Sequence, residues 1–221
     1  MTRESNLNRL ENSKEDIWSS EYLVYKYLNK EIHSAASKHA RGRLFDIGCG
    51  NKPYFNIFKS FIETYRGCDI VQSSKSCVDL ICEATQIPES TDTYDTVFST
   101  QVIEHVAEHQ LMLNEAFRIL KPNGKIILSG PAYWPIHEAP YDFFRFTKFG
   151  MLHIFQKAGF NNIQIVTCGS KWALRGIVFL YSIPGRPRFI NRIFNPIFAW
   201  LESKYPDDNY AVNYVVVATK P

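Results

Sequence analysis

The residues best placed to do chemistry in this 221-residue chain follow two predicted strands. The apolar run 43–47 leads into Gly48-Cys49-Gly50, and glycine, which carries no side chain, lets the backbone approach a ligand closely. Asp69 ends the next predicted strand, 23 residues after Asp46. A carboxylate at such a strand end can accept two hydrogen bonds from a ribose diol, so the pattern favours a nucleoside site. For Asp69 taken alone, the alternative is a solvated strand-end acid.

The same glycine turn excludes two other kinds of nucleotide site. A dinucleotide fingerprint needs a third glycine at position 53, where the chain has Pro53, and the Gly-Lys-Ser/Thr of a P-loop is absent. Glu83, directly after a third predicted strand, can accept a hydrogen bond from an exocyclic amine. The glycine turn and the two acids therefore describe a nucleoside site without phosphate contacts.

The segment 130–147 follows a later strand and carries a second group of reactive side chains. It holds three prolines and many aromatic rings, which suit a stiff loop facing a substrate. Its polar groups are His137, Asp142 and Arg145. The alternative is structural: Asp142 and Arg145 pair with each other to brace the loop and to cap the helix predicted after Thr147.

These side chains need a scaffold in which strands and helices alternate. Hydrophobic periodicity predicts helices over 18–38, 54–61, 108–120 and 147–158. Apolar runs between turn residues predict strands over 43–47, 65–70, 78–81, 94–99, 125–129, 163–167 and 210–219, with a helix stop and turn over 121–124. Alternation at these short intervals predicts a doubly wound, mostly parallel α/β sheet.

Five motifs in this order resemble those of the class I S-adenosylmethionine-dependent methyltransferases, of the methyltransferase type 11 kind. They are FDIGCGN (45–51), GCDI (67–70), EATQIP (83–88), YDTVFSTQVIEHV (94–106) and LNEAFRILKPNGKIILSGP (113–131). The resemblance covers 43 to about 169, and 210–219 is similar to the family's final antiparallel strand. It implies a Rossmann-like seven-stranded, mostly parallel sheet with an antiparallel last strand, and S-adenosyl-L-methionine as methyl donor.

The resemblance also implies which residues hold the donor. In that family, Gly48 and Gly50 would flank the methionine moiety and Asp69 would bind the ribose. Glu83-Ala84 would lie by the adenine, with Glu83 in place of the more frequent Asp, and Gln101 would lie near the methionine end. The full set implied to bind the donor is Asp46, Gly48, Gly50, Asn51, Asp69, Ile70, Glu83, Ala84 and Gln101.

Methyl transfer from a sulfonium is an in-line displacement in which the enzyme mostly positions the nucleophile. A hydroxyl nucleophile also gains from a general base, for which His137 and His105 are the candidates, and the predicted catalytic set is completed by Asp142 and Arg145. The run DFFRFT (142–147) resembles a methyltransferase subfamily linked to glycan or natural-product pathways. We therefore expect O-methylation of a small-molecule, glycan or lipid-linked hydroxyl. The alternatives are N-methylation and a non-catalytic module that binds S-adenosylmethionine.

Glu104 and His105 raise the question of a metal. A similar Glu-x-x-Glu-His run binds a divalent metal in ubiquinone-pathway and small-RNA O-methyltransferases, but here Gln101 replaces the first Glu. A neutral amide is a poorer ligand for a hard cation than a carboxylate. Glu104, His105 and Asp142 could form only a weak site, so the sequence predicts no metal. The alternative for Glu104 and His105 is a hydrogen-bond network at a helix start.

Composition restricts the partners and the location. The net charge of +3 is too small to argue for nucleic acid, and five cysteines without a CxxC pair suit reduced thiols in a cytoplasm. No apolar run is long enough to span a bilayer, and the polar N-terminus lacks a secretory signal. The sequence does not predict the oligomeric state.

The predicted organisation is a helical arm over 1–40 and a methyltransferase domain over 41–221, with an aromatic and basic helical insertion over 171–204. This insertion carries six Lys and Arg against one Glu, a formal charge of +5, which leaves −2 for the rest of the chain. It also holds seven Phe, Tyr and Trp rings. We expect it to be a lid over the acceptor site, a peripheral membrane contact or a dimer interface.

Overall fold

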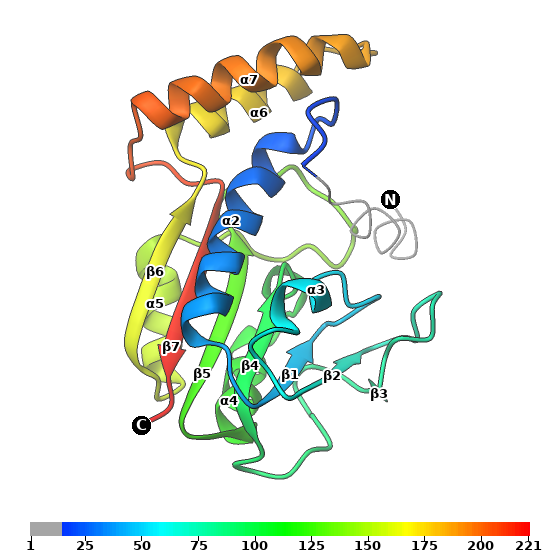
Figure 1. Cartoon of the computed structure of the whole chain (residues 1–221), viewed down its shortest axis with the longest axis vertical. Helices are drawn as coiled ribbons and strands as arrows, with labels where there is room; N and C mark the ends of the chain where they lie inside the picture. Colours follow the sequence, from blue (N-terminus) through cyan, green and yellow to red (C-terminus); the bar gives the residue numbers. More distant parts are fainter. Residues whose placement is uncertain (1–14) are drawn as a thin grey trace.

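The computed structural model describes residues 15–221, so the first 14 residues of the predicted arm lie outside the described residues. One seven-stranded sheet has the order β3-β2-β1-β4-β5-β7-β6 (Figure 1). Its strands are β1 Arg43–Ile47, β2 Thr64–Asp69, β3 Leu80–Ile81, β4 Tyr94–Thr100, β5 Leu120–Pro131, β6 Asn161–Cys168 and β7 Asn213–Thr219. The helices are α2 Tyr22–His39, α3 Phe55–Phe58, α4 His109–Ile119, α5 Lys148–Lys157, α6 Lys171–Tyr181 and α7 Arg188–Lys204, with a turn of 3-10 helix at Ile103–His105.

The strand directions confirm the predicted fold class. β1 is parallel to β2 and β4, and β4 is parallel to β5, whereas β7 is antiparallel to both of its neighbours, β5 and β6. β6 therefore runs in the same direction as β5. As a result, the carboxyl ends of β1, β2, β4, β5 and β6 all meet one edge of the sheet, the edge at which open α/β sheets bind ligands.

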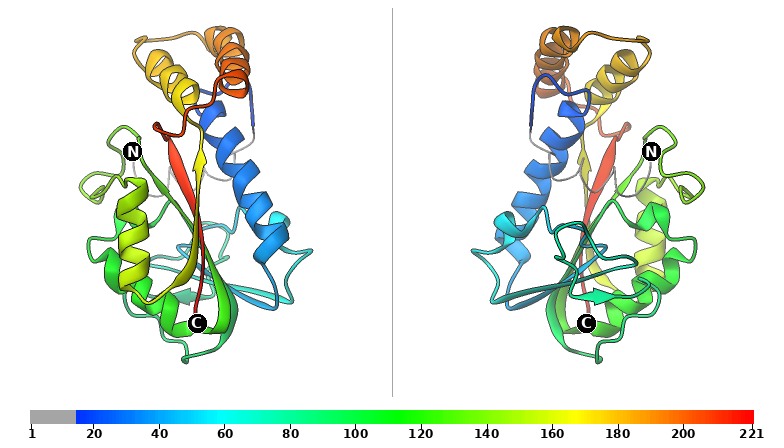
Figure 2. Two further views of the ribbon diagram at one scale, coloured as in Figure 1. Left: turned by 90° about the vertical axis from the view of Figure 1, so that its left-hand side faces the viewer. Right: turned by 90° about the vertical axis from the view of Figure 1, so that its right-hand side faces the viewer.

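Two layers of helices cover the sheet, α2 and α3 on one face and α4 and α5 on the other (Figure 2). Helix α2 is more than an arm, because Leu28, Ile32 and Ala36 are fully buried against the sheet. It begins at Tyr22 rather than at 18, since the chain before it forms turns.

The predicted turn at 121–124 lies instead inside a strand. β5 runs unbroken from Leu120 to Pro131, and its pairing with β4 shifts register between Tyr94 and Thr96. Asn123 takes a positive φ of 63° within this irregularity, and its N–H donates to the carbonyl of Lys220. The turn-forming residues thus make a bulge, because the neighbouring chain end supplies partners that local sequence does not reveal.

Helices α6 and α7 form a hairpin that stands beyond the sheet, next to the N-terminal end of α2 (Figures 1 and 2). We call residues 171–204 the α6–α7 hairpin. It follows β6 directly and therefore stands at the carboxyl edge of the sheet. Over residues 15–221, none of the helices has both the length and the apolar character needed to cross a bilayer.

Candidate active site

The turn after β1 can be closed only by glycine. Gly48 has φ +78°, and a Cβ built on it would lie 2.3 Å from Cγ2 of Val102. The N–H groups of Gly48 and Cys49 both donate to the carbonyl of Cys68, each at 2.9 Å. These contacts hold the turn against β2, so the backbone after β1 is fixed at the carboxyl edge.

Asp69 connects the end of β2 to this turn. Its side chain is buried and accepts hydrogen bonds from the N–H of Gly50 at 3.1 Å and from its neighbour Ile70 at 2.8 Å. The two N–H donors set the orientation of the carboxylate at the strand end. Asp69 also lines the larger cavity of the carboxyl edge.

Two cavities meet at Gly48. The larger, of about 370 Å³, lies within the range of about 300–1,000 Å³ typical of ligand pockets. It is lined by Gly48, Asp69, Ile70, Glu83, Ala84, Val102, His105, Tyr141 and Phe143, among others. The smaller is lined by Asp46, Gly48, Gly50, Asn51, Pro53, Thr100 and Gln101, among others. All nine residues predicted to bind the donor therefore line one cavity or the other.

Gln101 turns the chain out of β4 between the two cavities. It has a positive φ of 53°, its N–H donates to the carbonyl of Ser129 at 3.2 Å, and its side-chain amide donates to the Ser129 hydroxyl at 3.1 Å. This pairing with β5 holds the amide at the strand end. Gln101 thus makes a structural contact with β5 and also lines the smaller cavity.

Asp46 is a buried acid beside the glycine turn. It is 3 % exposed and accepts a hydrogen bond of 2.6 Å from the Tyr65 hydroxyl. Burial raises its pKa to about 7, although the Tyr65 hydrogen bond opposes the rise. A cationic group entering the small cavity would favour the ionised form of Asp46.

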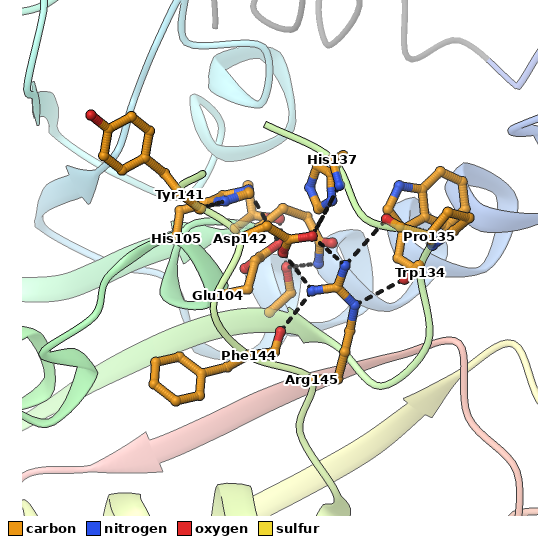
Figure 3. A network of polar contacts seen from close by, with 12 residues as sticks. Glu104, His105, Trp134, Pro135, His137, Tyr141, Asp142, Phe144 and Arg145 are labelled. Carbon is orange, nitrogen blue, oxygen red and sulfur yellow. Dashed lines mark hydrogen bonds and ion pairs between the residues drawn. The ribbon is translucent and has the colours of Figure 1, made fainter. Parts of the chain in front are cut away.

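The 131–147 loop is attached to the chain segment after β4. The N–H groups of Phe143 and Phe144 donate to the carbonyl of Glu104, and Nδ1 of His105 donates to the carbonyl of Tyr141 at 2.6 Å (Figure 3). Because Nδ1 carries the proton in that bond, the lone pair of the neutral ring lies on Nε2 of His105. The loop thereby brings its polar residues beside the larger cavity.

Asp142 and Arg145 brace this loop. The guanidinium makes a two-pronged contact with the carboxylate at 2.6 and 2.8 Å, and it also donates to the carbonyls of Trp134, Pro135 and Phe144 (Figure 3). Burial acts to raise the pKa of Asp142, but the hydrogen bonds from Arg145 and from the His137 N–H lower it to about 2. Both side chains are occupied in holding the loop, as the structural alternative expects, but neither caps α5, whose cap is the Thr147 side chain that accepts from the N–H of Gly150.

His137 lies against His105. The two ring centroids are 4.7 Å apart, and the backbone N–H of His137 donates to Asp142 at 3.0 Å. Its Nδ1 is buried and has no hydrogen-bond partner, although it lies 3.4 Å from an Asp142 oxygen. Burial, followed by the neighbouring His105, lowers the pKa of His137. The structure therefore brings together the two histidines that the sequence offers as candidate bases.

Glu104 is the member of this group whose setting the sequence does not reveal. Its side chain is fully buried, and neither carboxyl oxygen has a hydrogen-bond partner. Burial raises its pKa to about 8. The sequence places Glu104 beside His105, but it gives no sign that a loop 30 residues later would close over it. The helix-start network expected for Glu104 and His105 does not include the Glu104 carboxylate, and the backbone carbonyl of Glu104 and Nδ1 of His105 bond to the loop instead.

Comparisons with known proteins match this geometry. Residues 45–128 match a family described as a methyltransferase domain. The chain belongs to the class I S-adenosylmethionine-dependent methyltransferases. Among curated proteins, it is 35 % identical over 107 residues to the chloroplastic 2-methyl-6-phytyl-1,4-hydroquinone methyltransferase of Spinacia oleracea. It is 30 % identical over 95 residues to a tRNA (carboxymethyluridine(34)-5-O)-methyltransferase of Xenopus tropicalis.

The likeness of fold extends over nearly the whole chain, whereas the sequence matches cover only part of each curated relative. A SAM-dependent methyltransferase from Archaeoglobus fulgidus superposes with a TM-score of 0.59 at 17 % identity, covering 94 % of this chain and 97 % of that one. The matched segments are 47 % of this chain and 31 % of the spinach protein, and 38 % of this chain and 14 % of the frog protein. The chain thus spans only about a third or less of the length of these two curated relatives.

The residues at the carboxyl edge fit S-adenosylmethionine. The larger cavity has room for a nucleoside, with the oriented Asp69 carboxylate at its wall and the exposed apolar side chain of Ile70 beside it. The smaller cavity offers the buried Asp46 carboxylate to a cationic amino group. The close contact of Gly48 with Val102 leaves no space for a side chain where the two cavities meet.

Proposed function

We propose that this methyltransferase transfers the methyl group of S-adenosyl-L-methionine to a hydroxyl of a small-molecule, glycan or lipid-linked acceptor. The observation that carries the proposal is the pair of touching imidazoles, His105 and His137, at the end of a cavity suited to the donor. When bound, the donor supplies an electrophilic methyl group on a sulfonium. The chain's own residues then have to hold the donor, present the acceptor oxygen and accept its proton.

Donor binding is assigned to the strand ends. Asp69 accepts hydrogen bonds from the ribose hydroxyls, Ile70 and Ala84 contact the faces of the purine, and Glu83 accepts from its exocyclic amine. In the smaller cavity, Asp46 favours the cationic amino group of the methionine moiety, which Gly48 and Gly50 allow to approach the backbone. Asn51 and Gln101 complete the polar wall.

The transfer step needs a proton acceptor for a hydroxyl. The acceptor oxygen forms a bond to the methyl carbon, the electron pair of the carbon–sulfur bond stays on sulfur, and the hydroxyl proton leaves to a base. His105 lines the cavity and keeps a lone pair on Nε2, and His137 lies directly behind it. Arg145 and Asp142 act indirectly, by holding the loop that carries His137.

The test measures S-adenosylhomocysteine formation over a panel of sugar, phenol, polyprenol-linked, amine and RNA acceptors. We expect turnover with a hydroxyl acceptor, and a drop of about two to four orders of magnitude in His105→Ala or His137→Ala. The exposed His153 on α5 provides the matched control, His153→Ala, which should be unchanged. Turnover on amines alone would replace the proposal with N-methylation. Tight donor binding with no turnover on any acceptor would favour a binding module.

The lipid-linked member of this acceptor class is favoured by the α6–α7 hairpin. Helix α7 turns its polar side chains inward: Asn191, Asn195 and Glu202 are buried. Its apolar residues Phe189, Ile193, Ile197 and Trp200 recur every three or four positions and are about half exposed. A surface helix ordinarily has the opposite arrangement, so this outer stripe is a contact surface.

Charge favours an anionic lipid surface as the partner of this stripe. The hairpin has a formal charge of +5, and its single acid, Glu202, is buried. Arg188, Arg192 and Lys204 are exposed on the same helix as the stripe. Cationic helices with an outward aromatic and aliphatic stripe lie in the interface of anionic membranes. We propose that the hairpin makes this peripheral contact.

The position of the hairpin is consistent with delivery of a lipid-linked acceptor. It stands at the carboxyl edge of the sheet, and Trp134 of the 131–147 loop packs against α6, with its ring 5.6 Å from that of Tyr181. No residue of the hairpin lines either of the two cavities, which favours a surface contact over a lid. The spinach relative's name contains a phytyl hydroquinone, a lipid-like acceptor, which adds support.

Flotation with vesicles tests this contact. Binding should need anionic lipid, weaken with salt, and fall in the double variant Ile193→Ser/Trp200→Ser. Phe149→Ser, which alters an even more exposed apolar side chain on α5, should float like the wild type. Absence of flotation on either vesicle type would contradict the membrane proposal. A change of oligomeric mass in the double variant without lipid would assign the stripe to a dimer interface instead.

A further inference from the structure

We propose that Glu104, His105 and His137 form a binding site for one divalent first-row transition-metal ion. One ligand atom of each of the three side chains lies within 4.8 Å of the others. Two imidazoles and one carboxylate are a donor set typical of such ions, and they leave further coordination positions open. The sequence expectation of no metal considered Asp142 as the third ligand, whereas the structure offers His137 in its place.

The unpaired atoms of the cluster point to an absent partner. Glu104 is fully buried, and both of its carboxyl oxygens lack a hydrogen-bond partner within the described residues. Nδ1 of His137 is also buried and unpaired. Buried polar groups are almost always satisfied, so a group of this kind calls for an ion, a water or a ligand. A cation would satisfy both residues at once.

The surroundings of the cluster are those of a metal site. His105 donates its Nδ1–H to the carbonyl of Tyr141, and metal-ligating histidines characteristically donate their second nitrogen to such an acceptor. Its Nε2 lies 3.9 Å from Oε1 of Glu104. Asp142 is neutralised by Arg145 and accepts the backbone N–H of His137 at 3.0 Å, which fixes the position of that residue. Ligands held about 2.1 Å from an ion lie roughly 3–3.5 Å apart, so the site closes by about 1 Å on binding.

The ion would serve the proposed methyl transfer, and its catalytic role rests on that function. Of the three ligands, His105 lines the larger cavity, so an open coordination position would face the acceptor. A hydroxyl bound to a divalent cation loses its proton more readily, and the proton would pass to solvent. The two histidines would then act as ligands in the reaction instead of as bases.

The test uses the full-length, tag-free protein after chelation, with Mn²⁺ and Co²⁺ as probes and neither donor nor acceptor present. We expect one ion per chain by calorimetry, and a Co²⁺ visible spectrum without the intense charge-transfer band that cysteine thiolates would give. His137→Ala and Glu104→Gln should each weaken binding at least tenfold. His153→Ala, which removes an exposed histidine from α5, should bind like the wild type. Circular dichroism checks that the variants fold. If Glu104→Gln does not fold, the ion affinity of His137→Ala alone decides whether the site exists.

Two outcomes would overturn the site: no binding of either ion by the wild type, or binding that both variants retain. Methyl transfer by metal-free protein would overturn the catalytic role and leave the proposed function intact. Conversely, binding that is lost in the variants would support the site even if no acceptor were ever methylated. The failure of one proposal is therefore distinguishable from the failure of the other.

Discussion

The 131–147 loop and the α6–α7 hairpin are both rich in aromatic residues and both stand at the carboxyl edge of the sheet, yet their buried acids have different surroundings. In the loop, Asp142 is paired with Arg145, while Glu104 below it and the neighbouring His137 keep unpaired atoms beside a cavity. In the hairpin, Glu202 binds three backbone N–H groups and holds the fold together. The two buried glutamates thus differ: both carboxyl oxygens of Glu104 lack a hydrogen-bond partner, whereas both of Glu202 accept from backbone N–H groups.

The largest predicted effect concerns Glu202. Its carboxylate caps the N-terminus of α6 from across the hairpin, accepting from the N–H groups of Ser170, Trp172 and Ala173. Glu202→Ala leaves these donors unpaired, and we expect a local loss of about 5 kcal/mol. Amide exchange over 171–181 should then rise by roughly a few thousandfold, and donor binding should persist. Lys204→Ala, at an exposed position of the same helix, is the control. Unchanged amide exchange over 171–181 would mean that Glu202 does not stabilise the hairpin.

The next prediction concerns Asp46, the buried acid of the donor site. Burial raises its folded pKa to about 7, above the ordinary value of 3.8, so its contribution to stability is complete below about pH 4 and is lost as the pH rises to about 7. That difference corresponds to about 4 kcal/mol. Asp46→Asn, neutral at every pH, should be more stable than the wild type at pH 8 and show no such advantage at pH 4.5.

Urea denaturation at the two pH values measures this effect. Asp208→Asn, at an exposed position, serves as the control for the loss of one negative charge. The same stability difference between wild type and Asp46→Asn at both pH values would show that Asp46 is ionised throughout. In that case, Asp46 would be a stabilised, ionised acid like Glu202.

The smallest predicted effects concern α7, which buries polar side chains and exposes apolar ones. Asn195 is buried and donates to the carbonyls of Ile17 and Ser19, so Asn195→Leu should cost about 2–3 kcal/mol although it makes the helix more apolar. Trp200 is 56 % exposed, and Trp200→Ser should cost less than about 1 kcal/mol. Thermal unfolding compares the two. A larger loss for Trp200→Ser than for Asn195→Leu would mean that the aromatic stripe packs within the protein.

The sequence allowed the sheet and the donor cavity to be predicted because both depend on local patterns. Strands are recognisable in the sequence as apolar runs. The carboxyl ends of parallel strands meet at one edge of the sheet, and this brings Gly48, Asp69 and Gln101 together. The exceptions arise from distant partners. The bulge at Asn123 depends on Lys220, nearly 100 residues later, and no turn signal could have revealed it.

The histidines and the 131–147 loop were predicted less completely than the donor cavity, again because their contacts depend on distant partners. The sequence offered His105 and His137 separately, and nothing periodic in a proline-rich loop indicates which side chains touch. The contact follows from the hydrogen bonds between the loop and the carbonyl of Glu104. Likewise, the charge and rings of 171–204 were visible, but the inward direction of Asn191 and Asn195 depends on acceptors at Ile17, Trp18 and Ser19.

The central claim is that the carboxyl edge of the sheet binds an S-adenosyl nucleoside through Asp69, and calorimetry with S-adenosylhomocysteine tests it most directly. We expect saturable one-to-one binding by the wild type. Asp69→Ala should lose ten- to a hundredfold in affinity, about 1.5–3 kcal/mol. Glu63→Ala, at an exposed acid of the same chain segment, should bind like the wild type, and near-ultraviolet circular dichroism should show that both variants fold. Unchanged affinity in a folded Asp69→Ala protein, or no binding by the wild type, would contradict the account.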